Sequence, residues 1–124
     1  MKIPILLINY KEEDQKLYFP LLMSNGFSPH SASSMQDALI MLADREFACV
    51  VINGDNFEYI PLLKVMRKIT KAPLCVSVSH YQQDENKNAV INGADIFRVR
   101  YDEAENRVER FSDFVKIYLE FVSG

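Results

Sequence analysis

The chain has 124 residues, 48% of them hydrophobic and 25% charged, and a formal net charge of −3. This length and composition predict one folded domain rather than a disordered segment. The acidic balance argues against a domain whose main contacts are with DNA or anionic lipid, and no apolar run approaches the roughly 20 residues that a membrane-spanning helix needs. No export signal stands at the N-terminus, so we expect a soluble domain in the cytoplasm.

The first predicted elements are a strand and a helix. Ile3–Ile8 is a continuous apolar run with the length and composition of a strand buried on both faces, as in parallel sheets. Lys11–Asn25 is expected to be a helix, with acidic residues in its first turn and Gly26 as the residue that ends it. Pro20 lacks a backbone donor and should either bend this helix or move its start to a later residue. Leu17, Leu21 and Asn25 line one side of this helix, with Leu22 beside them.

The next predicted elements are a weaker strand, Phe27–Ala32, and a second helix. Pro29 interrupts the strand, which predicts a position near the edge of the sheet, because proline cannot donate to a strand ladder. Either Ser33 or Ser34 can cap the helix that follows, and Asp37 lies three residues after Ser34 in a rough capping box. The apolar stripe of this helix is formed by Ala38, Leu39, Leu42 and Ala43.

The rest of the chain continues the alternation of strands and helices. The expected strands are 47–52, 74–79 and 96–99, and the expected helices are 60–69, 82–92 and 103–122. Five strand–helix repeats predict an α/β fold with a doubly wound, five-stranded parallel sheet of order 2-1-3-4-5 and helices on both faces. No glycine-rich fingerprint follows the first strand and no Walker-type loop is present, which argues against nucleotide binding.

Two cysteines, Cys49 and Cys75, lie within apolar runs. Neither belongs to a CxxC motif or to a Cys/His spacing that is typical of metal sites. The pattern therefore favours two buried thiols in a reducing compartment over a disulfide.

Three segments of the chain resemble response-regulator receiver domains. Phe47–Asn53 is similar to the third strand of that family, which ends in the phosphoacceptor aspartate, and Pro73–Ser79 is similar to its fourth strand. Asn92–Arg100 is similar to the Gly-Ala-Asp segment that leads to the family's fifth-strand lysine. The resemblance covers residues 1–124 and implies a flavodoxin-like receiver (response regulatory) domain. It also implies a signalling domain rather than an enzyme.

The residues at the family's phosphorylation site depart from the family pattern. Asn9 and Tyr10 stand where receivers carry the acidic pair that holds Mg²⁺, and Asn53 stands at the phosphoacceptor aspartate. Val78 stands at the switch serine or threonine, and Arg100 stands at the lysine. The resemblance therefore implies a vestigial phosphoacceptor pocket, formed by Asn9, Tyr10, Asn53, Asp55, Val78, Ser79 and Arg100.

These replacements should disable phosphorylation at the usual position. Mg²⁺ is held mainly through carboxylates, and an acyl phosphate needs a carboxylate nucleophile, which the amide of Asn53 does not supply. We therefore expect no metal, no cofactor and no enzymatic activity. Two alternatives stay open: Asp55 serves as a substitute phosphoacceptor, or the emptied pocket binds a small molecule in a flavodoxin-like domain.

The resemblance also implies how such a domain acts. Receivers pair through a face made of the fourth helix, the fifth strand and the fifth helix, so we expect a homodimer through these elements. An atypical receiver of this kind would control an output such as transcription within a two-component phosphorelay. Receivers are often the N-terminal part of a regulator with a C-terminal DNA-binding domain, and the same arrangement is open here. This segment itself is expected to contact neither nucleic acid nor membrane.

Overall fold

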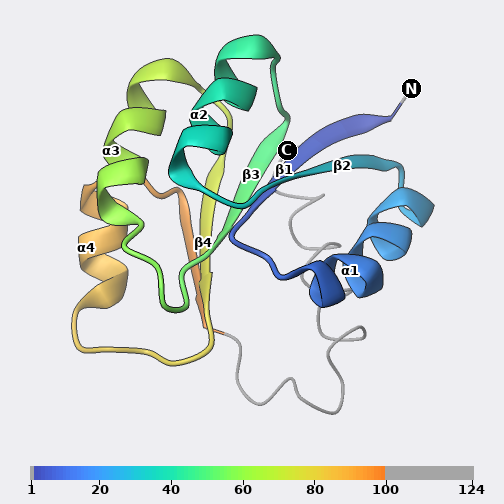
Figure 1. Cartoon of the computed structure of the whole chain (residues 1–124). Helices are drawn as coiled ribbons and strands as arrows, with labels where there is room; N and C mark the ends of the chain where they lie inside the picture. Colours follow the sequence, from blue (N-terminus) through green and yellow to red (C-terminus); the bar gives the residue numbers. More distant parts are fainter. Residues whose placement is uncertain (1, 100–124) are drawn as a thin grey trace.

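The computed structural model describes residues 2–99, which form a five-stranded parallel sheet flanked by helices (Figure 1). The elements, in chain order, are β1 (Ile3–Ile8), α1 (Glu12–Ser24), β2 (Phe27–Ala32), α2 (Met35–Asp44), β3 (Cys49–Asn53), α3 (Ile60–Ile69), β4 (Leu74–Val78), α4 (Glu85–Ile91) and β5 (Ile96–Val99). The strand order is β2-β1-β3-β4-β5, so the expected doubly wound topology is confirmed. The last expected helix, 103–122, lies outside the described residues. Among residues 2–99, no helix combines the length and the apolar character needed to cross a membrane.

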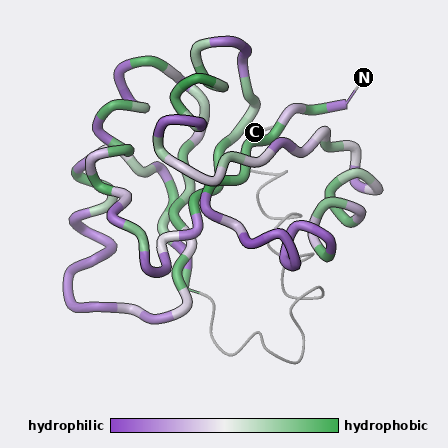
Figure 2. The backbone as a smooth tube through the Cα atoms, in the orientation of Figure 1, coloured by the Kyte–Doolittle hydropathy of each residue, from purple (hydrophilic) through white to green (hydrophobic). Residues whose placement is uncertain are grey.

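Successive residues of a strand point to opposite faces of the sheet, so the buried apolar side chains form two layers, one on each face. Leu6 and Ile8 of β1 belong to the layer that also holds residues of α2, α3 and α4, while Ile5 and Leu7 belong to the layer on the α1 side. Figure 1 shows α1 on one side of the sheet and the other three helices on the opposite side. The central strands are hydrophobic along most of their length (Figure 2). Burial on both faces explains the continuous apolar runs from which these strands were predicted.

Strand β2 lies at one edge of the described sheet, as its proline predicted. Pro29 stands beside Ile5 of β1 in the parallel register. An edge strand pairs on one side only, so a residue without a backbone donor is tolerated there.

Helix α1 faces the core with only part of the side that the sequence lined with leucines. Tyr18 and Leu22 are buried and Leu21 packs against the same layer, whereas Leu17 is 42% exposed. The helix begins at Glu12 and continues through Pro20, so the later start that Pro20 suggested is wrong. Pro20 is exposed, and water can therefore hydrate the carbonyl that loses its backbone partner.

The ends of the helices follow local signals in the sequence. Gly26 has a φ of 89°, a left-handed conformation that glycine adopts without strain at the end of a helix. Ser34 caps α2, and its hydroxyl oxygen accepts a hydrogen bond from the Asp37 amide at 3.1 Å. Helix α4 begins at Glu85, three residues later than expected, because Asp84 has a φ of 60° and lies outside the helical region.

Hydrogen bonds around Arg67 join the end of α3 to the starts of β4 and β5; we call this group the Arg67 clamp. The Arg67 guanidinium forms an ion pair of 2.9 Å with Asp95, and the same carboxylate oxygen accepts the Leu74 amide at 2.8 Å. The guanidinium also donates to three backbone carbonyls, those of Gly93 (3.2 Å), Thr70 (2.8 Å) and Ala72 (2.9 Å). The Gly-Ala-Asp segment therefore lies at the amino ends of the strands, where it stabilises the fold.

Candidate functional site

The carboxyl ends of β1 and β3 bring Asn9 and Asn53 together. The Asn9 side-chain amide donates to the Asn53 carbonyl at 2.9 Å, and the Asn53 side-chain amide donates to the Asn9 carbonyl at 3.2 Å. Asn9 has a φ of 67°, a left-handed conformation that asparagine adopts more readily than most residues. These neutral side chains thus tie two neighbouring strands together at the edge where the vestigial phosphoacceptor pocket was predicted.

Asp55 links this pair of asparagines to β4. Its backbone amide donates to the Asn53 side-chain oxygen at 3.1 Å, and its carboxylate Oδ1 accepts from the Ser79 amide at 2.8 Å. Because Ser79 directly follows β4, one carboxylate joins the loop after β3 to the loop after β4. Hydrogen bonds to an ionised acceptor are stronger than neutral ones. We call Asn9, Asn53, Asp55 and Ser79 the polar cluster.

Two other residues of the predicted pocket lie in the core instead of the polar cluster. The Tyr10 ring belongs to the apolar layer on the α1 side, where it packs edge-on against Tyr18 with ring centroids 5.8 Å apart. Val78 is buried in the opposite layer, which holds α2, α3 and α4. Arg100 lies outside the described residues. The structure thus brings together four of the seven residues that the sequence singled out.

Arg98 is a residue of this region that the sequence analysis did not single out. The parallel register places Asn53 beside Ser77 and Ser77 beside Arg98, so the three form a row across β3, β4 and β5. Ser77 is buried, and its hydroxyl oxygen lies 3.5 Å from Nη1 of Arg98. Side chains alternate between the two faces of a strand, so a pattern that selects position 100 also selects position 98. This alternation is the signal by which Arg98 could have been predicted.

The charges of the polar cluster differ from those of a phosphate-accepting magnesium site. Asp55 supplies its single carboxylate, and the side chains of its other members are amides and a hydroxyl. Neutral amide oxygens compete weakly with water for Mg²⁺, which proteins bind mainly through carboxylates. Within residues 2–99, no three His, Cys, Asp or Glu side chains are grouped so that they could hold a metal ion.

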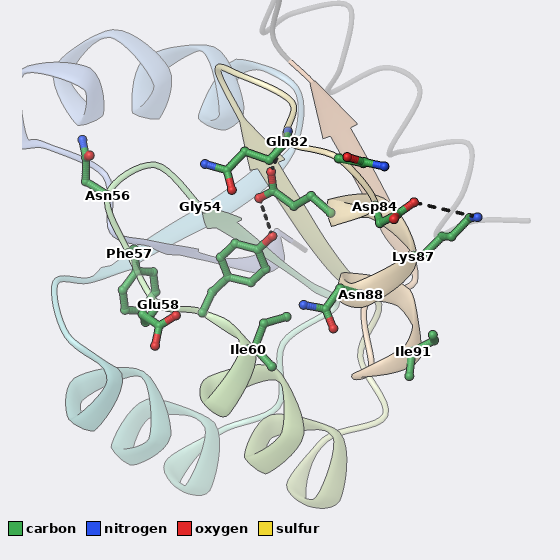
Figure 3. Close-up of a pocket in the computed structure, with 13 residues that line it drawn as sticks. Gly54, Asn56, Phe57, Glu58, Ile60, Gln82, Asp84, Lys87, Asn88 and Ile91 are labelled. Atoms are coloured by element: carbon green, nitrogen blue, oxygen red, sulfur yellow. Dashed lines mark hydrogen bonds and ion pairs between the residues drawn. The ribbon is translucent and has the colours of Figure 1, made fainter.

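A groove of about 890 Å³ lies next to the polar cluster, between the loop after β3 and helix α4 (Figure 3). Tyr59 is only 6% exposed there, and its hydroxyl donates to a carboxylate oxygen of Glu85 at 2.7 Å. Burial raises the pKa of Tyr59 well above its ordinary value. This hydrogen bond and the negative charge of Glu85 act in the same direction. A Cβ on Gly54 would lie 2.9 Å from Tyr59 Cε1 and 2.7 Å from Val78 Cγ1. Tyr59 therefore connects α4 to the residue that follows Asn53.

The comparisons with known proteins place this geometry on a known fold. No protein-family model matches the sequence, and no curated protein matches it either. A two-component response regulator from Clostridium difficile is similar in structure, with a TM-score of 0.78 and 17% identity, over 96% of this chain and 97% of that chain. The chemotaxis response regulator CheY4 of Vibrio cholerae gives a TM-score of 0.77 at 12% identity, over 98% of this chain and 99% of that one. A response regulator receiver domain from Methylobacillus flagellatus gives 0.73 at 16% identity, over 94% and 98%.

These structural neighbours are response regulators and receiver domains, and the chain shares their fold. The receiver fold that the sequence resemblance implied is therefore confirmed. Identities between 12% and 17% establish the fold alone, so the role of the polar cluster has to be argued from its own residues.

Proposed function

We propose that this chain is an atypical receiver-like signalling domain of the two-component type, which acts through protein contact and is not phosphorylated at the end of β3. The receiver fold supports the class of protein. The proposed mode of action rests on the position of Asn53. This residue ends the central strand, and its side-chain amide donates to the Asn9 carbonyl.

An asparagine at this position lacks the chemistry of a phosphoacceptor. The nitrogen lone pair of an amide is delocalised into the carbonyl, and no acyl phosphate can form without a carboxylate nucleophile. Asn9, which stands where the family keeps an acid for Mg²⁺, contributes a neutral side chain that is already bonded to Asn53. Without a bound cation, the charge of a transferring phosphoryl group would also be poorly stabilised.

The carboxylate of Asp55 supports a state that needs no phosphate. It joins the loops after β3 and β4 through the Ser79 amide, which lies 2.8 Å from the carboxylate oxygen. The Asp55 side chain links the two loops without phosphorylation, whereas a phosphoryl group would do so only while it is attached. We therefore expect one arrangement of these loops, with signalling set by binding and release of a partner.

The output is expected to follow from contacts on the side of α4 and β5. Val90 of α4 and Tyr81 before it are large, exposed apolar residues, which is typical of protein contact surfaces. Pairing of two copies through this side, together with residues 103–122, would control an attached output such as a DNA-binding domain. Light scattering across a concentration series tests the pairing, and a strict monomer at high micromolar concentration would contradict it.

The phosphate-independent mode is tested by intact-mass measurement after incubation with acetyl phosphate and Mg²⁺. The natural chain is expected to gain no phosphoryl mass. A double variant, Asn9→Asp with Asn53→Asp, restores carboxylates at both positions and is expected to gain it. Phosphorylation of the natural chain would contradict the proposal. If Asp55→Asn then abolished the gain, Asp55 would be the substitute phosphoacceptor.

A further inference from the structure

The groove between the β3–α3 loop and α4 presents apolar side chains from both of its sides. Phe57 and Ile60 come from the β3–α3 side and are half-buried, while Ile91 comes from α4 and is 82% exposed. Figure 3 shows Phe57 and Ile91 on opposite sides of the groove, with Ile60 between them. A small-molecule pocket usually encloses most of its ligand, so a side chain as exposed as Ile91 favours contact with a polypeptide.

The same groove is acidic. Glu58 on one side and Asp84 and Glu85 on the other contribute three carboxylates among the described residues that line it. The lysine of this lining, Lys87, lies 3.9 Å from Asp84 and so offsets part of that charge locally. The remaining negative charge complements basic groups and disfavours acidic ones, which is how charged rims select their partners.

We infer that this groove binds a short segment of a partner protein in which apolar side chains are flanked by lysine or arginine. The apolar side chains of the segment would pack between Phe57, Ile60 and Ile91, and its basic groups would face Glu58 and Asp84. Four amide side chains among the described residues also line the groove and suit the backbone of such a segment: Asn56, Gln82, Gln83 and Asn88.

The position of Tyr59 gives this contact a route to the polar cluster. Tyr59 bonds to Glu85 on α4, and its ring packs against Gly54, which directly follows Asn53. Tyr59 therefore links the α4 side of the groove to the end of β3 through one side chain. The inference rests on the proposed function in that it takes protein contact as the way the domain acts.

Binding of labelled synthetic peptides, measured by fluorescence anisotropy at low and physiological salt, tests the inference. The probes are a set of peptides of about 14 residues that share the same number of lysines and leucines and differ in leucine spacing. At least one spacing is expected to bind saturably. A peptide with glutamate in place of lysine is expected not to bind.

Matched variants distinguish binding in the groove from nonspecific attraction of a basic peptide to an acidic protein. Glu58→Lys with Asp84→Lys is expected to weaken binding about tenfold, because two attractions become repulsions. Asp44→Lys with Glu46→Lys makes the same change of charge at exposed positions near the opposite end of β3, and is expected to weaken binding less than about twofold. Equal weakening by the two pairs, or no saturable binding by any peptide, would overturn the inference.

A second pair of variants tests the apolar half of the groove. Ile91→Asp is expected to abolish saturable binding, whereas Ile40→Asp, at a 60% exposed position on α2, should leave it intact. Circular dichroism of each variant checks that the fold is retained. Equal effects of the two substitutions would refute the inference. The intact-mass test of the proposed function involves none of these residues, so the two ideas fail separately.

Discussion

Removal of the Arg67 clamp should destabilise the domain more than the truncation of a partly exposed side chain usually does. Arg67→Ala removes the ion pair with Asp95 and three hydrogen bonds to backbone carbonyls. The two side chains are 32% and 40% exposed, so the ion pair itself contributes only about 0.5 kcal/mol. Each carbonyl bond contributes about 1 kcal/mol, because water replaces it incompletely at half-buried positions. The free energy of unfolding should therefore fall by about 3.5 kcal/mol in total.

Urea unfolding followed by circular dichroism measures this loss, with Lys68→Ala as the matched control on the same helix. Lys68 is exposed, and its truncation should change the free energy of unfolding by less than about 0.5 kcal/mol. Arg67→Lys keeps the charge but lacks the planar fork of donors, so it should recover only part of the stability. A loss no larger for Arg67→Ala than for Lys68→Ala would refute the assignment of the clamp.

Three further substitutions test other contacts. The pKa of Tyr59 is raised in the folded state, so stability is fully present below the unfolded tyrosine value of about 10 and is lost as the pH rises above it. When urea unfolding is measured at several alkaline pH values, the free energy of unfolding should fall less with rising pH for Tyr59→Phe than for the natural chain. An equal fall for the two proteins would contradict the raised pKa of Tyr59. Gly54→Ala should lower the free energy of unfolding by about 1–3 kcal/mol, because the new Cβ overlaps Val78 Cγ1, and the same substitution should cost less in a Val78→Ala background than in the natural chain. Ser34→Ala should lower it by about 1 kcal/mol, since the α2 cap is lost, and Ser33→Ala should have the smaller effect.

The sheet was predictable because each central strand is buried on both faces. The bounds of β1 and β5 and those of helix α3 agree with the sequence prediction residue for residue. Helix faces were harder to predict. Leu17 and Tyr18 are adjacent in the sequence of α1 and both are largely apolar, so only packing decides that Tyr18 is buried and Leu17 exposed. The start of α4 depends on the left-handed backbone of Asp84, which no strong sequence signal marks.

The candidate site was predicted in part. Strand order alone implies that Asn9 and Asn53 meet, since carboxyl ends of neighbouring parallel strands share an edge. The burial of Tyr10 was not foreseen, because the direction of its ring depends on the left-handed turn at Asn9. The bond between the Asp55 carboxylate and the Ser79 amide depends on loop geometry, which local patterns do not encode.

The proline in β2 limits how copies of this chain can associate. An open sheet edge is a template on which a strand of another molecule can add, and such growth leads toward fibres. Pro29 in the middle of this six-residue edge strand interrupts the row of backbone donors that an incoming strand would need. Crowded copies should therefore resist the addition of strands along this margin of the described sheet.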